Sequence, residues 1–258
     1  MSVIRRLGQA AAVTAIAGTV GGAAVIAGQA MLARSRRYAQ PDLRLAMRAS
    51  LGDASAPTLR LVLLGDSTAL GVGVERVTDT VGGQLATLLA DAADGRRVEL
   101  SSVAVSGSRS ADLGTQVARA LVGARPDVAV ILVGGNDAIH LTPPADAADD
   151  LSSAVRRLRG AGVEVVVGTC PDLGTARAFP QPLRQLVGWQ ARRLARAQAA
   201  AVNGAGGAPV DLAAQTGPVF RADAGAYCHD GYHPSADGYR VWAHALLPAA
   251  TEASAVPQ

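Results

Sequence analysis

Apolar runs alternate with helical stretches from Leu59 onward, and this alternation restricts the chain to a small set of folds. Four runs are rich in Val, Leu and Ile: "LRLVLLGD" (59–66), "VELSSVAV" (98–105), "DVAVILVGG" (127–135) and "VEVVVGTC" (163–170). A weaker fifth run is "APVDLAAQ" (208–215), and the helical patterns cover 81–93, 111–123, 145–159, 181–203 and about 236–252. Continuous apolar runs are typical of strands buried on both faces. We therefore predict an α/β fold, a doubly wound parallel sheet of about five strands in a three-layer α/β/α arrangement.

Small and polar residues follow three of the predicted strands, and an Asp–His pair precedes the closing helix. Ser67 lies in "GDS" after the first strand, Gly107 follows the second, and Asn136 lies in "GGND" after the third. Asp230 and His233 lie in "DGYHPS". Each stretch alone is ordinary turn or cap chemistry. Because ligands bind at the carboxyl ends of strands in such sheets, we expect these residues to share one edge and one site.

Together these five residues supply the parts of a serine hydrolase. We expect Ser67 to be the nucleophile, His233 the base that takes its proton, and Asp230 the carboxylate that orients the imidazole. The backbone N–H groups of Ser67 and Gly107 and the side-chain amide of Asn136 would form an oxyanion hole.

The sequence resembles the SGNH hydrolases, also called GDSL-like lipases and esterases, over residues 59–250. The family's four blocks match in order on the five residues named above. Thr68 departs from the Leu of the family's older name, which is a common variation. The resemblance implies a flavodoxin-like sheet of strand order 2-1-3-4-5. It also implies hydrolysis of carboxylic ester or thioester bonds with no metal or other cofactor.

The expected function is a lipase-type serine esterase that cleaves short-to-medium acyl esters through an acyl-enzyme on Ser67. The loops after Gly107 and Asn136 are short, and no inserted lid occupies 137–150, so the site should be open. The substrate would be a small-molecule or lipid acyl ester. An envelope carbohydrate deacetylase, an acyltransferase and a non-catalytic binding module on the same fold remain open alternatives.

A metal site is the alternative explanation of "CHDGYH". Cys228, His229, Asp230 and His233 are all possible zinc ligands, and the two histidines have the i,i+4 spacing of a helical site. Gly231 and the proline that follows His233 disfavour a helix there, so we expect no metal. Asp66 and Asp137 are expected to hold loops by hydrogen bonds to the backbone.

The basic character of the chain is confined to its N-terminal segment. Residues 1–37 contain five arginines and no acidic residue; removing these five from the 24 basic residues leaves 19 against 21 acidic residues. The remainder is slightly acidic, so we expect no nucleic-acid partner. The chain has no lysine, which excludes lysine-dependent nucleophiles and P-loops.

The N-terminal segment is expected to target the protein to a membrane. Its uncharged run, 7–33, would span about 40 Å as a helix, more than the ~30 Å hydrocarbon core of a bilayer. Residues 1–37 are therefore a signal peptide or an N-terminal anchor, and the protein is exported or anchored in the cell envelope.

The remaining segments complete the expected organisation. We predict a linker at 38–58 with a short helix near 42–50, a hydrolase domain at 59–252 and a flexible tail at 253–258. Cys170 and Cys228 both lie near the expected active edge. They would form a disulfide in an exported domain or remain two free thiols.

Overall fold

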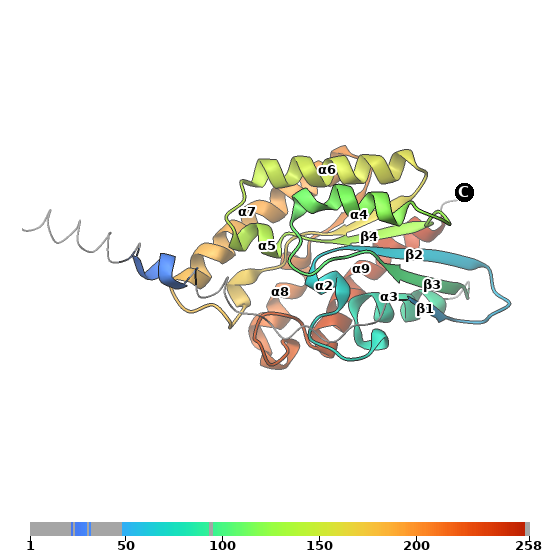
Figure 1. Cartoon of the computed structure of the whole chain (residues 1–258). Helices are drawn as coiled ribbons and strands as arrows, with labels where there is room; N and C mark the ends of the chain where they lie inside the picture. Colours follow the sequence, from blue (N-terminus) through green and yellow to red (C-terminus); the bar gives the residue numbers. More distant parts are fainter. Residues whose placement is uncertain (1–21, 23, 30, 32–47, 93–94, 256–258) are drawn as a thin grey trace, which may run out of the picture.

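A six-stranded sheet forms the centre of the molecule (Figure 1). The computed structural model describes residues 22, 24–29, 31, 48–92 and 95–255. In spatial order the strands are β1 (Arg48–Leu51), β3 (Arg97–Ser102), β2 (Thr58–Gly65), β4 (Val128–Leu132), β5 (Glu164–Gly168) and β6 (Ala208–Val210). Strands β2 to β6 are parallel, whereas β1 pairs with β3 antiparallel. The five parallel strands confirm the expected order 2-1-3-4-5, and β1 adds an edge strand that was not expected.

Helices cover both faces of the sheet. On one face lie α3 (Val81–Ala90) and α9 (Ala236–Ala255), and on the other lie α4 (Leu113–Ala120), α6 (Pro144–Gly160) and α7 (Leu183–Gly204). Within residues 48–92 and 95–255 the other helices are α2 (Ser67–Leu70), α5 (Gly135–Ile139) and α8 (Leu212–Ala222), with 3-10 segments η1 (Val77–Asp79), η2 (Ser110–Asp112), η3 (Leu173–Thr175) and η4 (Ala224–Ala226). This arrangement is the predicted three-layer α/β/α fold (Figure 1).

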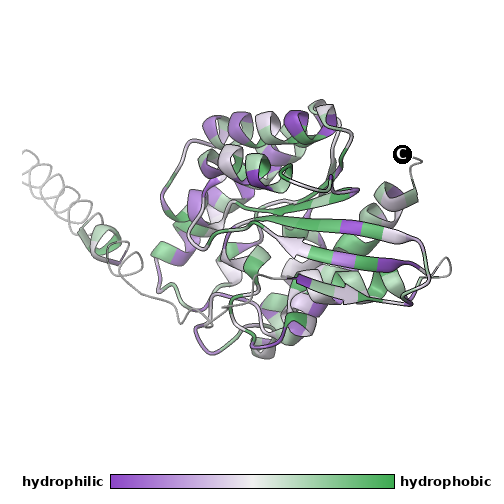
Figure 2. Ribbon diagram, turned by 45° about the vertical axis from the view of Figure 1, so that its right-hand side comes forward, coloured by the Kyte–Doolittle hydropathy of each residue, from purple (hydrophilic) through white to green (hydrophobic). Residues whose placement is uncertain are grey.

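Strands β2, β4 and β5 are buried from both sides over most of their length, because alternate residues of each strand enter different layers. In β3, by contrast, only Val98 and Leu100 are buried, so the second run was wrongly expected to be buried on both faces. In β2, Leu61 and Leu63 pack with α3 and α9, whereas Val62 and Leu64 pack with α4 and α6. All five residues of β4 are buried. Figure 2 shows the result as green strands between helices that carry purple on their outer surfaces. A charged residue in the middle of β4 would have no solvent on either side.

The predicted linker is wrong at its C-terminal end, because residues 48–51 form β1 rather than the end of a helix. Ala49 and Leu51 pack into the core beside α3, whereas Arg48 and Ser50 are exposed. This alternation has the period of a half-buried strand, but over four residues it also fits a helix. Residues 42–47 lie outside the described residues.

Two further boundaries differ from the sequence prediction. The fifth run forms strand only at 208–210, and α8 follows it with Asp211 as its N-cap, since the carboxylate accepts from the N–H of Ala214 (2.9 Å). Gly217 and Pro218 inside α8 obscured its helical pattern. At the C-terminus, α9 continues to Ala255, so the first three residues of the predicted tail are helical.

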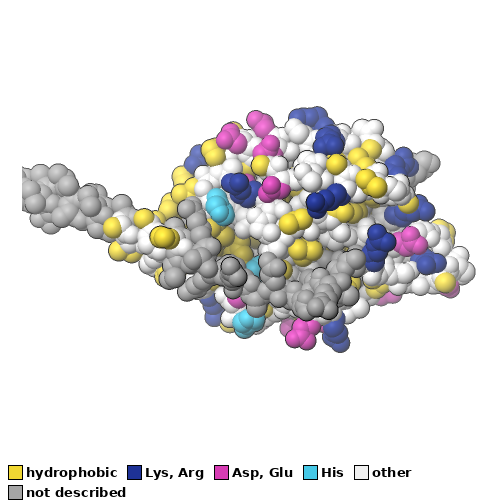
Figure 3. Space-filling model, viewed as in Figure 1, with side chains coloured by type: hydrophobic (Ala, Val, Ile, Leu, Met, Phe, Trp, Pro, Cys, Tyr) yellow, Lys and Arg dark blue, Asp and Glu magenta, His cyan; other side chains and the backbone are white. Residues whose placement is uncertain are grey.

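Most of the expected signal or anchor, 1–37, lies outside the described residues. In the described part, Ile26 packs against a buried cluster that includes residues of α7, and the Nε2 of Gln29 donates to the carbonyl of Gln181 (3.0 Å). Figure 3 shows hydrophobic side chains on this segment and on the adjoining part of the body. None of the helices among the described residues has the length and apolar character needed to cross a bilayer.

Candidate active site

Ser67 lies at the turn where β2 ends and α2 begins. A Cβ on Gly65 (φ +129°) would lie 1.7 Å from the carbonyl oxygen of Leu132, so only glycine allows β2 to end this close to β4. Asp66 caps α2, and its Oδ1 accepts from the N–H (2.9 Å) and the Oγ1 (2.8 Å) of Thr68. Ser67 is 6% exposed. The turn therefore places the hydroxyl just beneath the surface at the carboxyl edge of the sheet.

Ser67, His233 and Asp230 form a hydrogen-bonded series. The Nε2 of His233 lies 2.9 Å from the Oγ of Ser67, and its Nδ1 lies 2.6 Å from the Oδ2 of Asp230. The Oδ1 of Asp230 accepts from the N–H groups of Tyr232 (2.7 Å) and His233 (2.9 Å). Burial alone would raise the pKa of Asp230, but these hydrogen bonds and the imidazole outweigh it and hold the pKa well below its usual range. The carboxylate is thus ionised while it accepts from His233.

Gly107 lies in the loop after β3 and Asn136 in the first turn of α5, and a hydrogen bond connects the two segments. The N–H of Ser108 donates to the carbonyl of Val105 (3.1 Å), which closes a turn with Gly107 at φ +82°. The Nδ2 of Asn136 donates to the carbonyl of Ser108 (3.0 Å). The structure therefore brings the loop after β3 next to the helix that follows β4.

Comparisons with known proteins show the family of the chain. The model of the GDSL-like Lipase/Acylhydrolase family matches residues 63–241, which include all five expected site residues. The chain belongs to the GDSL-like lipase/acylhydrolase family. It is also 45% identical over 197 residues to the GDSL-like esterase Rv1075c of Mycobacterium tuberculosis. That match covers 76% of this chain and 62% of the relative, so the chain spans less than two thirds of the relative's length.

Solved structures share the fold of this GDSL-like chain. TesA has a TM-score of 0.59 at 21% identity, covering 75% of this chain and 99% of that one. A putative SGNH hydrolase from Slackia heliotrinireducens has a TM-score of 0.56 at 26% identity, covering 75% of this chain and 99% of that one. A variant of Axe2, an acetyl xylan esterase from Geobacillus stearothermophilus, gives 0.55 at 18% identity, covering 79% and 99%.

Buried polar side chains hold the loops of this GDSL-like site. The Oδ2 of Asp137 accepts from the N–H (3.0 Å) and the Oγ (3.1 Å) of Ser110, which confirms the expected loop-holding role. Gln116 was not predicted as a site residue. Its side-chain amide forms hydrogen bonds with Gly65 and Ser108. The signal that could have found it is a glutamine on the apolar face of the helical pattern 111–123.

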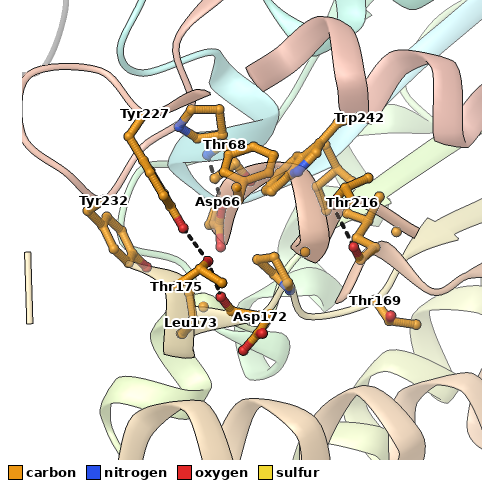
Figure 4. A pocket seen from close by; sticks show the side chains of 18 of the residues that line it. Asp66, Thr68, Thr169, Asp172, Leu173, Thr175, Thr216, Tyr227, Tyr232 and Trp242 are labelled. Carbon is orange, nitrogen blue, oxygen red and sulfur yellow. Dashed lines mark hydrogen bonds between the residues drawn. The ribbon is translucent and has the colours of Figure 1, made fainter. Parts of the chain in front are cut away.

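A pocket lies beside the GDS turn (Figure 4). It contains about 570 Å³ of empty space, part of it open to solvent. Figure 4 shows Tyr227 and Tyr232 on one side and Trp242 with Thr216 on the other. The hydroxyls of Tyr227 and Thr175 lie 2.5 Å apart. Burial raises the pKa of Tyr227 to about 12, so its hydroxyl keeps its proton.

Asp66 lines the same pocket. Its side chain is 3% exposed, and burial raises its pKa to about 6, although the hydrogen bonds from Thr68 and the nearby His233 act in the opposite direction. Asp66 was expected to hold a loop through the backbone, and its bond to the N–H of Thr68 confirms this.

The region "CHDGYH" is a tight loop rather than a helix. Tyr227 and Pro234 form an antiparallel bridge, and the N–H of Cys228 donates to the carbonyl of His233 (2.9 Å). His229 is exposed, whereas His233 is 2% exposed. Within the described residues no three His, Cys, Asp or Glu side chains are grouped so that they could hold a metal ion. The helical spacing of the two histidines therefore has no counterpart in the structure.

The two cysteines are free thiols, which decides between the two alternatives left by the sequence. Cys170 is buried, and burial raises its pKa well above the usual value. Burial likewise raises the pKa of Cys228 to about 11. Both thiols are thus held in their protonated, weakly nucleophilic form.

Proposed function

We propose that this chain hydrolyses short-to-medium acyl esters through an acyl-enzyme on Ser67. The observation that carries the proposal is the buried series from the Oγ of Ser67 through His233 to Asp230, with both bonds at 2.9 Å or less. A serine hydroxyl is a weak nucleophile unless an adjacent base takes its proton, and His233 lies where such a base must lie.

In the proposed reaction, His233 takes the proton of Ser67 as Oγ attacks the acyl carbonyl carbon. Asp230 stabilises the imidazolium that forms. His233 then returns the proton to the leaving alcohol, and water attacks the acyl-enzyme with His233 again as base.

The oxyanion of each tetrahedral intermediate needs hydrogen-bond donors. We assign this role to the N–H groups of Ser67 and Gly107 and to the side-chain amide of Asn136. The Nδ2 of Asn136 carries two N–H groups. One donates to the carbonyl of Ser108, and the second is the donor we assign to the oxyanion.

We assign the acyl group to the pocket beside the GDS turn. Thr68 and Tyr232, the neighbours of Ser67 and His233 in the chain, both line it. The lining also includes Asp172, Thr169, Thr175 and Thr216. A long alkyl chain gains most from a continuous apolar lining. The rest of the lining is largely apolar, with Leu173, Leu212 and Phe220 among its members, but the space is limited to about 570 Å³. This limited space supports substrates at the short end of the range.

The test compares the full chain with Ser67→Ala on p-nitrophenyl esters from acetate to palmitate, with and without EDTA. We expect the variant to lose on the order of 10⁴- to 10⁶-fold in kcat. We also expect EDTA to leave the rate unchanged and acetate or butyrate to be the best substrate. Activity that survives Ser67→Ala would overturn the mechanism, and a maximum at palmitate would overturn the acyl assignment.

The same acyl-enzyme would serve an acyltransferase or a carbohydrate deacetylase. Product analysis with a competing alcohol separates hydrolysis from transfer, and release of acetate from acetylated oligosaccharides identifies a deacetylase. We also propose that residues 1–37 lead to export or anchoring in the cell envelope. Fractionation of cells that express the full chain tests this, and recovery only from the cytoplasm would overturn it.

A further inference from the structure

Gln116 is a buried amide on an otherwise apolar helix face. It lies on α4, where the other buried residues are Leu113, Val117 and Ala120, and it is 1% exposed. A buried amide costs free energy unless hydrogen bonds replace its lost water. An apolar side chain of similar size would fill the same space without that cost. The three hydrogen bonds of Gln116 therefore indicate a role beyond filling the core.

Two of these bonds go to Gly65, the last residue of β2. The N–H of Gly65 donates to the Oε1 of Gln116 (2.7 Å), and the Nε2 of Gln116 donates to the carbonyl of Gly65 (2.9 Å). The neighbouring strand β3 ends at Ser102, before its chain turns away toward Gly107. The carbonyl of Gly65 also accepts from the backbone N–H of Val105 (3.1 Å), so Gln116 supplies the acceptor for the N–H of Gly65 and a second donor to its carbonyl.

The third bond goes to the loop that carries Gly107. The Nε2 of Gln116 also donates to the Oγ of Ser108 (3.1 Å), the residue directly after Gly107. Ser108 in turn accepts from Asn136 through its carbonyl. One side chain therefore connects the strand that leads to Ser67 with the turn of Gly107, and through Ser108 it connects both with Asn136.

We propose that Gln116 is a positioning residue that sets the spacing of the oxyanion donors. Each proposed donor lies within two residues of an atom in this network. The inference rests on the proposed function, because it assigns Gln116 to the same serine mechanism. Gln116 itself does not touch the substrate.

Only an amide can make this connection at this position. Both of its N–H groups and its carbonyl are in use, so a carboxylate would lack the donors and a thioether would lack all three bonds. Donors to an oxyanion matter most in the transition state, and a shift of about 1 Å can cost about 10²-fold in rate. Loss of the connection should therefore lower kcat while KM changes little.

The experiment compares Gln116→Met with Gln190→Met in the full chain. Gln190 is a matched control: it is 4% exposed on α7, and its Nε2 donates to the carbonyl of Thr142 (2.7 Å), a bond that involves none of the proposed donors. Kinetics on the best p-nitrophenyl ester and Tm are measured for both variants. Inhibition by an alkylboronic acid is also measured, since its adduct with Ser67 places a negative oxygen where the oxyanion forms.

We expect Gln116→Met to lower kcat by about tenfold to a hundredfold and to weaken boronate inhibition in parallel, with KM within about twofold. Gln190→Met should lower Tm by a similar amount but keep kcat within about twofold. Equal kcat in the two variants, or a loss that appears only in KM, overturns the positioning role.

Two further measurements test the positioning role of Gln116. If Gln116→Met does not fold, Ser108→Ala removes one arm of the connection and should lower kcat severalfold; unchanged kcat there overturns the role. If the unaltered chain is inactive, or Ser67→Ala remains active, the proposed function fails, and the positioning role fails with it. These results are distinct from an active, Ser67-dependent enzyme that is indifferent to Gln116.

Discussion

The two halves of the candidate active site are held in different ways. On the oxyanion side, meaning the loops after β2, β3 and β4, buried side chains bond the backbone of neighbouring loops; Gln116 and Asp137 are the main examples. The Asp–His loop, Tyr227–Pro234, is instead closed on itself by a bridge at its two ends. Its Tyr232 ring packs edge-on against Phe179, with ring centres 5.7 Å apart.

This difference follows from where each half begins. The oxyanion side grows from the ends of parallel strands, whose spacing the sheet already fixes. The Asp–His loop follows η4 and leads into α9, so no strand determines its position. It is anchored from outside by the N–H of Ala178, which donates to the carbonyl of Gly231 (3.0 Å). We therefore expect the oxyanion side to depend on distant partners and the Asp–His loop to depend on its own carboxylate.

Among the changes that distinguish the two halves, Asp230→Asn has the largest expected effect. An asparagine can still accept from the N–H groups of Tyr232 and His233, so the loop should keep its shape. Its amide would face the Nδ1 of His233 with a donor and favour the wrong tautomer, which should lower kcat by on the order of 10³–10⁴. Asp237→Asn, an exposed carboxylate that pairs with Arg240, is the control. A loss below tenfold would show that the loop does not work through its carboxylate.

A smaller loss is expected for Asn136→Ala on the oxyanion side. Removal of one donor should lower kcat by about 10²–10³. The same change also frees the carbonyl of Ser108, so Tm should fall as well. Kinetics and thermal unfolding of Asn136→Ala are compared with Asn203→Ala, an exposed asparagine at the end of α7. An unchanged kcat together with a lowered Tm would reduce Asn136 to a structural role.

The sequence could predict the chemistry of both halves, because Ser67, Asn136 and His233 lie in short motifs next to strand ends or helix caps. It could not predict how the halves are held. Gln116 is 51 residues from Gly65, and only the packing of α4 on the sheet brings them together. Short elements were also missed, because a four-residue strand such as β1 has too few residues to distinguish a period of two from a helical period.

The smallest expected effect tests the point where the two halves meet. Asp66 adjoins Ser67, and its charge is attracted by His233 and repelled by Asp137. Burial raises its pKa to about 6, whereas in the unfolded chain it should titrate near its ordinary value of ~3.9. Between these two pH values Asp66 is mostly deprotonated in the unfolded chain and mostly protonated in the folded chain. The stability that the protonated carboxyl contributes is therefore fully present below pH ~4 and is lost as pH rises through about 6.

Asp66→Asn removes this pH dependence while it preserves an acceptor for Thr68. From pH 4 to pH 8 the variant should gain about 2 kcal/mol in free energy of unfolding relative to the unaltered chain. Denaturant unfolding of both proteins across this range measures the difference. The control is Asp223→Asn, an exposed aspartate that caps η4 in the same way and should show no such gain. If the free energies of unfolding of the unaltered chain and of Asp66→Asn differed by the same amount at every pH, water would have to reach this carboxylate. The two halves of the site would then meet in a solvated space rather than across a buried charge.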